Sequence, residues 1–330
     1  MELRDKLVLI TGGCGLIGST IADLLLRDEH VRKVVVIDNL SRGAVLNLEE
    51  ARKLGEVELI RKDIRVPSEI RPHFDGVDIV FHQAAIRITA CAEKPRECLE
   101  VLVDGTFNVL EACVEAGVKK VIAASSASIY GAASLFPTVE DHHPYGNRTL
   151  YGAAKIANEG MLRAFNEMYR LPYVALRYFN VYGPRMDVFG KYTEVLIRWL
   201  DCLDRGERPK IFGDGKTSMD FIFSEDIARA NVLAARSDVS DEVFNVASGR
   251  ETTLLGLLEA LLQVTGHADV EPEFLPERAV NPVPRRLADI SKAAEKLGFC
   301  ARIGLEEGLR RLVEWRKRAI AAKQWQEYAP

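Results

Sequence analysis

The feature that most constrains this chain is a glycine-rich turn between a buried strand and a helix. Residues 6–11 (Lys-Leu-Val-Leu-Ile-Thr) are almost all apolar, as expected of a parallel strand that is covered on both faces. Glycines follow at positions 12, 15 and 18, and a helical pattern runs over 16–27. Glycines permit a tight turn, and a helix N-terminus offers unpaired N–H groups to a pyrophosphate. A glycine triplet alone is a weak signal, but this strand–turn–helix context predicts a dinucleotide site. The predicted contacts are Gly12, Gly15, Leu16, Ile17 and Gly18.

The alternation of strand and helix repeats along the first half of the chain. Apolar runs and helical patterns follow one another, with strands predicted at 33–37, 58–61, 78–81, 120–124 and 173–177 and helices at 46–54, 95–116 and 151–169. Such alternation predicts an α/β fold built on a doubly wound parallel (Rossmann) sheet. Later in the chain, shorter helical stretches alternate with loops that carry glycine and proline. We therefore expect a cofactor-binding domain over residues 1–178. A smaller mixed α/β substrate lobe should occupy 179–330, with some strands returning to the main sheet.

Composition argues against several classes of function. With 44 Lys and Arg against 48 Asp and Glu, the net charge is −4, and no basic run suits a phosphate backbone. We therefore expect no nucleic-acid partner. No window of the sequence approaches a membrane span, and the first residues lack signal-peptide features, which predicts a cytoplasmic protein without a membrane partner. The six cysteines include no Cys-x-x-Cys pair and no His at ligand spacing, which predicts reduced thiols and no metal site.

Polar residues follow the next strands at their carboxyl ends, where ligands bind in parallel sheets. Asp38 ends the second strand, 20 residues after the last glycine of the turn. Its carboxylate can accept both hydroxyls of an adenosine ribose and repel a 2′-phosphate, which predicts NAD rather than NADP. Because Arg42 lies nearby, NADP remains an alternative cofactor. In a structural interpretation, Asp38 caps the next turn. Asp63-Ile64 and the segment 82–85 follow two further strands. In an alternative interpretation, Asp63-Ile64 and the segment 82–85 are loop residues without a ligand, and His82 has only a structural role.

Tyr151 and Lys155 stand four residues apart in a segment whose composition favours a helix, so both side chains project from one face. Free tyrosine has a pKa of about 10, so a base that works near neutral pH needs about 4 kcal/mol of charge stabilisation. Lys155 and the positive nicotinamide ring can provide it together. The pattern alone is common on helix surfaces. A catalytic role is favoured because the pair follows a stretch of sequence that is predicted to bind a dinucleotide.

Further motifs extend over nearly the whole chain and point to one family. They are T-G-G-C-G-L-I-G, D-N-L-S-R-G, H-Q-A-A, S-S-A-S-I-Y-G, Y-G-A-A-K, R-Y-F-N-V-Y-G-P-R, F-G-D-G-K-T-S-M-D-F and R-R-L-A-D-I-S-K-A. The chain resembles the extended short-chain dehydrogenase/reductase family, in its nucleotide-sugar epimerase/dehydratase branch, and looks most like the UDP-glucose 4-epimerases. The resemblance implies that Ser126 polarises the sugar oxygen and Tyr151 moves the proton. Lys155 then holds the nicotinamide ribose and lowers the pKa of the tyrosine. Ser125 is the near competitor of Ser126.

The same resemblance implies the remaining ligand contacts. Besides the glycine turn and Asp38, the NAD contacts are Asn39, Ser41, Arg42, Gly43, Asp63, Ile64, Gln83, Ala84, Ala85, Ser125, Tyr151, Lys155 and Phe179. The nucleotide-sugar contacts are Arg87, Ser126, Asn180, Arg185, Phe212, Arg278 and Arg286. By the plainer alternative, Asn180 caps a turn and Phe212 belongs to the core.

The residues that follow Ser126 narrow the reaction. Dehydratases and decarboxylases of this family carry acidic residues there, whereas this chain has Ala127, Ser128 and Ile129. It therefore resembles the 4-epimerases, in which hydride leaves C4 for NAD and returns to the other face of a 4-keto sugar. The leading hypothesis is 4-epimerisation of a UDP-sugar, namely UDP-glucose or galactose, an N-acetylhexosamine or a glucuronate. The alternatives are another nucleotide-sugar oxidoreductase, such as a ketoreductase or atypical dehydratase, and a non-catalytic NAD-binding protein.

Three positions depart from the family's pattern. Met219 stands where the epimerases usually carry an arginine that grips the diphosphate, which shifts phosphate binding to Arg185, Arg278 or another cation. Arg286 stands at the gate that sets pocket size, usually Tyr, Cys or Ser, and can meet a sugar carboxylate or a phosphate there. Leu102 replaces an asparagine on the cofactor side.

Two helical ranges, 101–114 and 156–169, carry apolar residues at the spacing typical of a core. In the family that the chain resembles, the equivalent helices usually form a four-helix dimer contact. The resemblance therefore implies a homodimer.

Overall fold

A parallel sheet of seven strands forms the centre of the structure, a computed structural model that describes residues 1–188, 193–277 and 283–321. The strand order is β10-β6-β5-β4-β1-β2-β3, and every neighbouring pair is parallel. The order reverses between β1 and β4, which is where ligands bind in doubly wound sheets. The predicted α/β Rossmann fold is confirmed. Its strands are β1 (Leu7–Thr11), β2 (Lys33–Ile37), β3 (Val57–Ile60), β4 (Ile79–His82), β5 (Lys120–Ser126), β6 (Tyr173–Tyr178) and β10 (Glu242–Val246).

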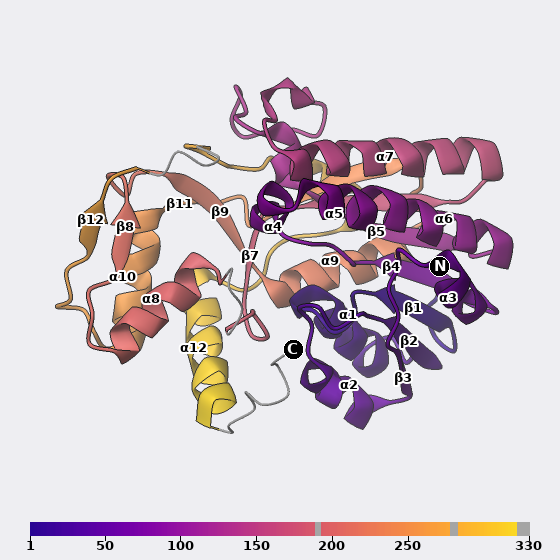
Figure 1. Cartoon of the computed structure of the whole chain (residues 1–330), viewed down its shortest axis with the longest axis horizontal. Helices are drawn as coiled ribbons and strands as arrows, with labels where there is room; N and C mark the ends of the chain where they lie inside the picture. Colours follow the sequence, from indigo (N-terminus) through magenta and orange to yellow (C-terminus); the bar gives the residue numbers. More distant parts are fainter. Residues whose placement is uncertain (189–192, 278–282, 322–330) are drawn as a thin grey trace.

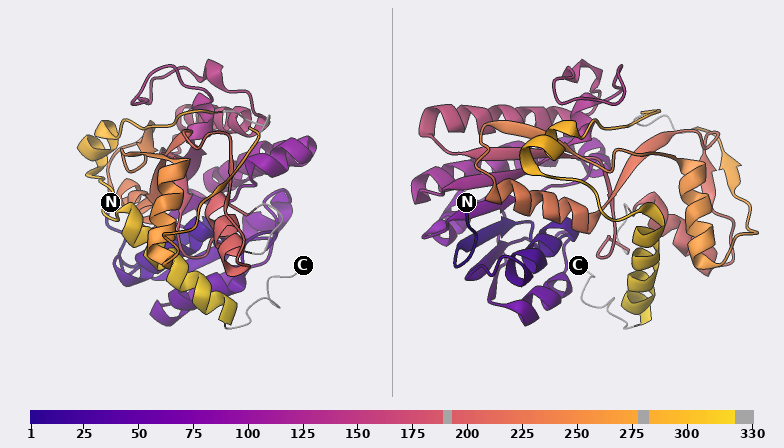
Figure 2. Two further views of the ribbon diagram at one scale, coloured as in Figure 1. Left: turned by 90° about the vertical axis from the view of Figure 1, so that its left-hand side faces the viewer. Right: turned by 180° about the vertical axis from the view of Figure 1, so that it is seen from behind.

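Helices cover both faces of this sheet, as Figure 1 and Figure 2 show. Strands β4 and β6 are buried along their whole length because apolar side chains on each face pack against helices. One face carries α1 (Leu16–Arg27), α2 (Glu49–Leu54), α9 (Ser224–Arg236) and α11 (Ser291–Leu297). The other carries α3 (Pro67–Ile70), α4 (Ile88–Glu93), α5 (Pro95–Leu99), α6 (Gly105–Ala116) and α7 (Leu150–Tyr169). Single turns lie in the connections: η1 (Val45–Leu48), η2 (Arg71–Phe74), η4 (Ala127–Tyr130) and η5 (Pro144–Gly146).

The predicted helix over 95–116 is not regular. It is divided into α5 and α6 by the π-helical turn η3 (Glu100–Asp104). A π turn takes one more residue than an α turn, and an apolar pattern read at 3.6 residues per turn does not reveal the extra residue. Leu102 lies in this turn, where it is 1% exposed, so its side chain belongs to the core.

A second lobe lies at one end of the sheet, on the left of Figure 1. It has its own apolar core, in which Trp199, Leu258 and Leu309 are buried. Its strands form a three-stranded sheet, β11-β9-β7, and the parallel pair β12-β8. Two elements from the second half of the chain belong to the main domain instead: β10 pairs with β6 in the main sheet, and α9 packs against that sheet. The elements of the lobe are β7 (Asn180–Tyr182), α8 (Val195–Asp204), β8 (Lys210–Phe212), β9 (Ser218–Phe223), β11 (Glu251–Thr253), α10 (Leu254–Thr265), β12 (Glu273–Leu275) and α12 (Leu305–Ala321).

The cysteine prediction is wrong for one pair. Cys91 on α4 and Cys98 on α5 form a disulfide, with Cα atoms 4.8 Å apart. Pro95 is the first residue of α5, and proline cannot continue the preceding helix α4. The chain therefore turns between the two helices and brings the two buried cysteine side chains together. A separation of seven residues carries no sequence signature of such a pair. Across the described residues, no helix is long and apolar enough to cross a bilayer.

Candidate active site

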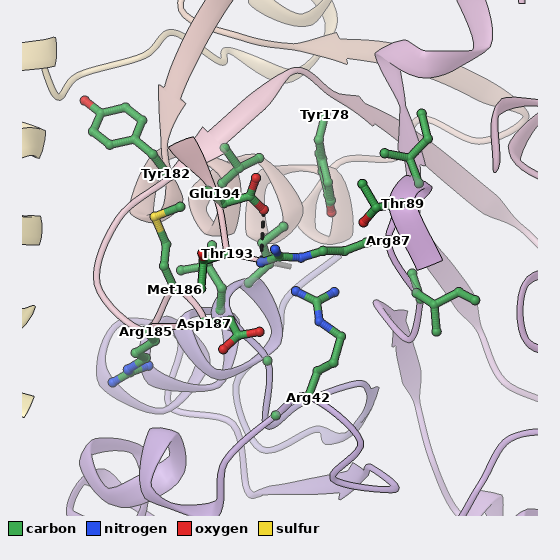
Figure 3. A pocket seen from close by; sticks show the side chains of 18 of the residues that line it. Arg42, Arg87, Thr89, Tyr178, Tyr182, Arg185, Met186, Asp187, Thr193 and Glu194 are labelled. Atoms are coloured by element: carbon green, nitrogen blue, oxygen red, sulfur yellow. Dashed lines mark ion pairs between the residues drawn. The ribbon is translucent and has the colours of Figure 1, made fainter. Parts of the chain in front are cut away.

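A cavity of about 1060 Å³ lies where the carboxyl ends of β1, β2, β4 and β5 meet the second lobe. Most of the residues that the sequence places at a ligand line this one cavity, part of which is drawn in Figure 3. Lys155 lies in the wall behind Tyr151 and is 3% exposed, and Arg278 lies outside the described residues. The predicted residues that line the cavity are Gly12, Gly15, Leu16, Ile17, Gly18, Asp38, Asn39, Ser41, Arg42, Gly43, Asp63, Ile64, Gln83, Ala84, Ala85, Arg87, Ser125, Ser126, Tyr151, Phe179, Asn180, Arg185, Phe212 and Arg286.

The glycine turn leaves no room for side chains. Gly12 has a φ of 68°, and a Cβ atom there would lie 2.7 Å from the backbone nitrogen of Ala84. A Cβ atom on Gly18 would lie 2.5 Å from the carbonyl oxygen of Gly12. Helix α1 begins after Gly15, and no side chain caps its first N–H groups. These groups therefore stay available to an anion in the cavity, as a pyrophosphate requires.

Asp38 and Asp63 form the acidic end of the cofactor half. The two carboxylate oxygens of Asp38 accept hydrogen bonds from the backbone nitrogens of Cys14 (2.9 Å) and Leu40 (2.8 Å), which fixes its orientation. Each oxygen keeps a lone pair for a ribose hydroxyl. Burial raises the pKa of Asp38. Burial would also raise the pKa of Asp63, but hydrogen bonds from Arg65 and Asn39 outweigh it and hold that pKa at about 2.

His82 has a structural role. Its ring bridges the hydroxyls of Thr11 (2.7 Å) and Thr106 (3.0 Å), and the residue is 4% exposed. Burial lowers its pKa to about 3, and the charge of Lys155 lowers it further, so the ring is neutral near pH 7. A buried ring with both nitrogens engaged has no site left for a ligand.

Ser126, Tyr151 and Lys155 come together at the catalytic end of the cavity. Ser126 ends β5, where its hydroxyl accepts a hydrogen bond from the nitrogen of Ser128 (3.1 Å) and interacts with the Tyr151 hydroxyl, whose pKa it lowers. Tyr151 lies in the first turn of α7, which Thr149 caps. Nζ of Lys155 lies 5.9 Å from the centre of the Tyr151 ring and donates a hydrogen bond to the carbonyl oxygen of Ala124 (2.6 Å). This is the predicted Ser–Tyr–Lys arrangement.

The electrostatics of this group differ from the expectation for Tyr151. In the protein alone, burial raises its pKa, while the hydrogen bond with Ser126 and the charges of Arg42 and Arg286 oppose the rise. Burial lowers the pKa of Lys155 to about 8, and the charge of Glu159 opposes that change. The lowered tyrosine pKa predicted from Lys155 and the nicotinamide charge thus requires the cofactor, because burial dominates without it.

The substrate half holds several arginines, of which two already have acidic partners. Nη2 of Arg87 lies 3.0 Å from a carboxylate oxygen of Glu194, and this pair spans the cavity (Figure 3). Nη2 of Arg185 lies 2.7 Å from a carboxylate oxygen of Asp23 on α1, while its Nη1 is buried without a hydrogen-bond partner among the described residues. Asn180 has a buried Oδ1 with no hydrogen-bond partner, which leaves it available to a ligand.

Met219 has less bearing on the site than its place in the motif suggests. It lies on β9, paired with Thr252, and is not among the residues that line the cavity, whereas Phe221 two residues later is. Met219 brings no cation to the cavity, so a phosphate bound there would depend on the arginines that line it.

Sequence reasoning missed Tyr178 and Glu194. The Tyr178 hydroxyl contacts Gln83 (3.0 Å) and Asn231, which fixes the position of two residues that line the cavity, Tyr178 and Gln83. Glu194 precedes α8 and pairs with Arg87. Tyr178 lies within the motif R-Y-F-N-V-Y-G-P-R, which by itself assigns it no contact, and Glu194 lies outside the motifs. Each acquires its place in the cavity from a contact with a distant part of the chain.

The fold and this constellation define a class. A Rossmann sheet with a side-chain-free turn at a helix N-terminus, an oriented Asp38 and a Ser–Tyr–Lys set fit a nicotinamide dinucleotide and catalysis of hydride transfer. The model of the NAD dependent epimerase/dehydratase family matches residues 8–247. The chain belongs to this family, and NAD is its cofactor.

Individual relatives match over nearly their whole length. The UDP-glucose 4-epimerase of Mycolicibacterium smegmatis is 36% identical over 315 residues, covering 93% of this chain and 97% of the relative. The UDP-N-acetyl-alpha-D-glucosaminuronate decarboxylase of Bacillus cytotoxicus is 31% identical, covering 94% and 97%. A solved structure, a UDP-N-acetylglucosamine 4-epimerase from Methanobrevibacter ruminantium in complex with UDP-N-acetylmuramic acid, superposes with a TM-score of 0.89 at 36% identity, covering 96% and 99%. The chain is thus similar to nucleotide-sugar epimerases in sequence and in fold.

Proposed function

We propose that this protein inverts the configuration at C4 of a UDP-sugar through a 4-keto sugar. The observation that carries the proposal is the meeting of Ser126, Tyr151 and Lys155 at a cavity large enough for two nucleotides. The turn that follows Ser126 supports an epimerase over a dehydratase. Its residues Ala127 and Ile129 are buried and bring no carboxylate for elimination.

Each residue has a defined task in this reaction. NAD supplies a hydride acceptor, and then a hydride donor, at C4 of the sugar. Tyr151 takes the proton of the C4 hydroxyl and returns it after the ketone has turned over. Ser126 donates a hydrogen bond to the same sugar oxygen, which polarises the ketone. Lys155 is fixed by Ala124 and places its positive charge beside the tyrosine, which favours the phenolate.

The proposal is tested on purified protein without added cofactor. The protein is incubated with UDP-glucose, UDP-N-acetylglucosamine and UDP-glucuronate, and the products are followed by NMR. Formation of a C4 epimer from at least one sugar is the expected result, since NAD is regenerated in each cycle. Absence of an epimer from every sugar would contradict the proposal.

A second candidate is a related nucleotide-sugar oxidoreductase or decarboxylase. The guanidinium of Arg286 in the catalytic end of the cavity, together with the similarity to a decarboxylase, favours it. Release of carbon dioxide from a uronate, or turnover that depends on added NADH, would support this candidate. Both are read in the same incubation.

We also propose that two copies associate through α6 and α7. Phe107 on α6 is 44% exposed and contacts Phe165 edge-to-face, while Tyr169 on α7 is 50% exposed. The Phe165 and Tyr169 rings lie 5.2 Å apart, so the exposed Phe107 and Tyr169 both pack against the buried Phe165 between the two helices. A second copy would remove this surface from water.

A further inference from the structure

Arg286 is presented to the cavity from a backbone that is held on two sides. Its nitrogen donates a hydrogen bond to the carbonyl oxygen of Ser218 (2.9 Å), and the nitrogen of Ser218 donates to Pro284 (3.0 Å). One residue later, the carbonyl oxygen of Leu287 accepts a hydrogen bond from the nitrogen of Thr138 (2.8 Å). The segment therefore bridges the second lobe and the main domain, and the base of the arginine is fixed relative to both.

The guanidinium lies at the catalytic end of the cavity. Arg286 lines the same cavity as Ser126 and Tyr151, and its charge acts on the Tyr151 hydroxyl, where it favours the phenolate. Ala288, two residues after Arg286, packs in one apolar cluster with Ala127, the residue that follows Ser126. With Tyr151 at the C4 oxygen, as the proposed function requires, Arg286 lies on the side of the cavity where the sugar ring binds. The ring positions next to C4 are C3 and C5, and their substituents are the nearest candidates for contact.

The other arginines around the substrate have acidic neighbours, but Arg286 has none. Arg87 pairs with Glu194 and Arg185 with Asp23, and the acidic neighbours of Arg42 include Glu194. Within the part of the chain that the structure describes, the Arg286 side chain has no hydrogen bond or ion pair, and its Nε is buried without a partner. Burial lowers the pKa of Arg286 to about 10, and the interaction with Tyr151 opposes this change, so the guanidinium stays charged near pH 7.

Arg286 is half-buried, and a buried donor such as its Nε is costly to leave without a partner, so a ligand that supplies an acceptor and a negative charge would be favoured there. A neutral hexose offers only hydroxyls, which leave the guanidinium charge uncompensated. A carboxylate matches the planar fork of donors with two charge-assisted hydrogen bonds. The chemistry of the site thus favours an acidic sugar over a neutral one.

We propose that Arg286 selects a nucleotide sugar whose hexose carries a carboxylate on a position next to C4, and binds that carboxylate beside Tyr151. The proposal rests on the proposed function and names its substrate class. Two sources share this chemistry. One is a uronate, with the carboxylate on C5, and the other is a sugar with an ether-linked acid on C3. In either case Arg286 acts as the specificity-determining residue.

Steady-state kinetics on wild-type protein and Arg286→Gln test the proposal. The panel contains UDP-glucuronate and UDP-N-acetylglucosaminuronate as uronates, UDP-N-acetylmuramate as the C3 acid, and UDP-glucose and UDP-N-acetylglucosamine as neutral sugars. Wild type should favour one acidic sugar over its neutral counterpart. Loss of one partner of a buried charge pair should lower kcat/KM for that sugar by about 30- to 1,000-fold in Arg286→Gln, with a smaller change for neutral sugars. The matched control is Arg285→Gln, whose side chain is 44% exposed and pairs with Glu251; it should behave as wild type.

Calorimetric binding to Tyr151→Phe and to the double variant Tyr151→Phe/Arg286→Gln gives a second readout that needs no turnover. The double variant should bind the preferred acidic sugar at least about tenfold more weakly and the neutral sugar with unchanged affinity. An equal loss for acidic and neutral sugars would overturn the proposal and place Arg286 at the diphosphate. Equal affinity of wild type for acidic and neutral sugars would also overturn it. If an epimer forms only from neutral sugars, the proposed function stands and this inference fails. If the protein binds acidic sugars selectively but forms no epimer, this inference stands and the proposed function fails.

Discussion

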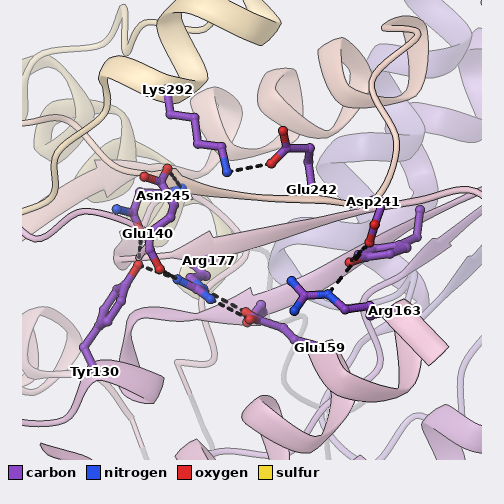
Figure 4. A network of polar contacts seen from close by, with 11 residues as sticks. Tyr130, Glu140, Glu159, Arg163, Arg177, Asp241, Glu242, Asn245 and Lys292 are labelled. Atoms are coloured by element: carbon purple, nitrogen blue, oxygen red, sulfur yellow. Dashed lines mark hydrogen bonds and ion pairs between the residues drawn. The ribbon is translucent and has the colours of Figure 1, made fainter. Parts of the chain in front are cut away.

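Arg177 holds Glu159 with two hydrogen bonds, from Nε to Oε1 (2.8 Å) and from Nη2 to Oε2 (2.6 Å), as Figure 4 shows. The side chains are 9% and 13% exposed, so this is a buried ion pair. Glu159 lies one turn beyond Lys155 on α7 and also accepts a hydrogen bond from Ser125. Arg177 donates further to the hydroxyl of Tyr130 (2.8 Å). The pair therefore joins α7, β5, β6 and the turn after Ser126 into one polar unit.

We expect Glu159→Gln to be strongly destabilising. The change leaves the buried guanidinium of Arg177 without a counterion, which costs about 3 kcal/mol in the free energy of unfolding. Urea denaturation measures the loss. Glu167→Gln, an exposed position on the same helix, is the control and should change stability by less than about 0.5 kcal/mol. Equal stabilities of the two variants would show that the pair contributes nothing.

Under the proposed function, Tyr151→Phe removes the group that moves the proton and leaves the packing of the ring in place. We expect kcat to fall by about 100- to 10,000-fold, the usual contribution of a positioned acid or base. NAD content should change little, because the glycine turn, Asp38 and most of the other predicted NAD contacts remain in place. Tyr145→Phe, at a residue 78% exposed, serves as the control. Turnover of Tyr151→Phe at the wild-type rate would assign the proton transfer to another group.

His82 should make the fold sensitive to acid. Burial lowers its folded pKa to about 3 from 6.5, so below pH 6.5 the unfolded chain binds a proton that the folded protein does not. Stability therefore falls as the pH decreases between 6.5 and about 3, by up to about 1.4 kcal/mol per pH unit from this residue. Urea denaturation at several pH values between 7 and 4 should show a shallower slope for His82→Gln than for wild type. The exposed His267→Gln should keep the wild-type slope. Parallel slopes in all three proteins would contradict the assignment.

Local chemistry explains which parts of the site could be predicted from the sequence. The glycine turn follows from backbone geometry that only glycine satisfies, as the 2.5 Å approach at Gly18 demonstrates. Tyr151 and Lys155 are neighbours on one helix, so their spacing alone places them together. The parallel strands follow from continuous apolar runs, since each is covered on both faces. In these cases the information lies within about 20 consecutive residues.

Contacts between distant parts of the chain could not be predicted in the same way. The Arg87–Glu194 pair joins residues from the main domain and the second lobe, and neither has a distinctive neighbourhood in the sequence. The partner of Arg185 is Asp23 on α1 rather than a ligand group, which no motif indicates. That the Nε of Arg286 has no hydrogen-bond partner among the described residues can be known only when the side chains around it have been placed. Such facts depend on packing, which the order of residues encodes only through the whole fold.

The disulfide between Cys91 and Cys98 should stabilise the segment that carries α4 and α5. A loop closed over a separation of seven residues gains about 2 kcal/mol from the reduced entropy of the unfolded chain. We therefore expect a reductant to lower the free energy of unfolding of wild type by about this amount. The double variant Cys91→Ala/Cys98→Ala should not respond to reductant, whereas Cys300→Ser, at an exposed free thiol, should respond as wild type does. Identical stabilities of wild type with and without reductant would mean that the bond does not form in solution.

The exposed aromatic residues Phe107 on α6 and Tyr169 on α7 lead to a prediction about the oligomeric state. Phe107→Asp places a charge in the centre of the proposed contact, where burying it without a partner costs several kcal/mol, so we expect a monomer. Light scattering after size-exclusion chromatography should give a dimer mass for wild type and half of it for the variant. Leu135→Asp changes another exposed apolar residue, 68% exposed, outside both helices and should leave the dimer intact. A wild-type monomer, or an unchanged mass for Phe107→Asp, would show that copies of this chain do not associate through these helices.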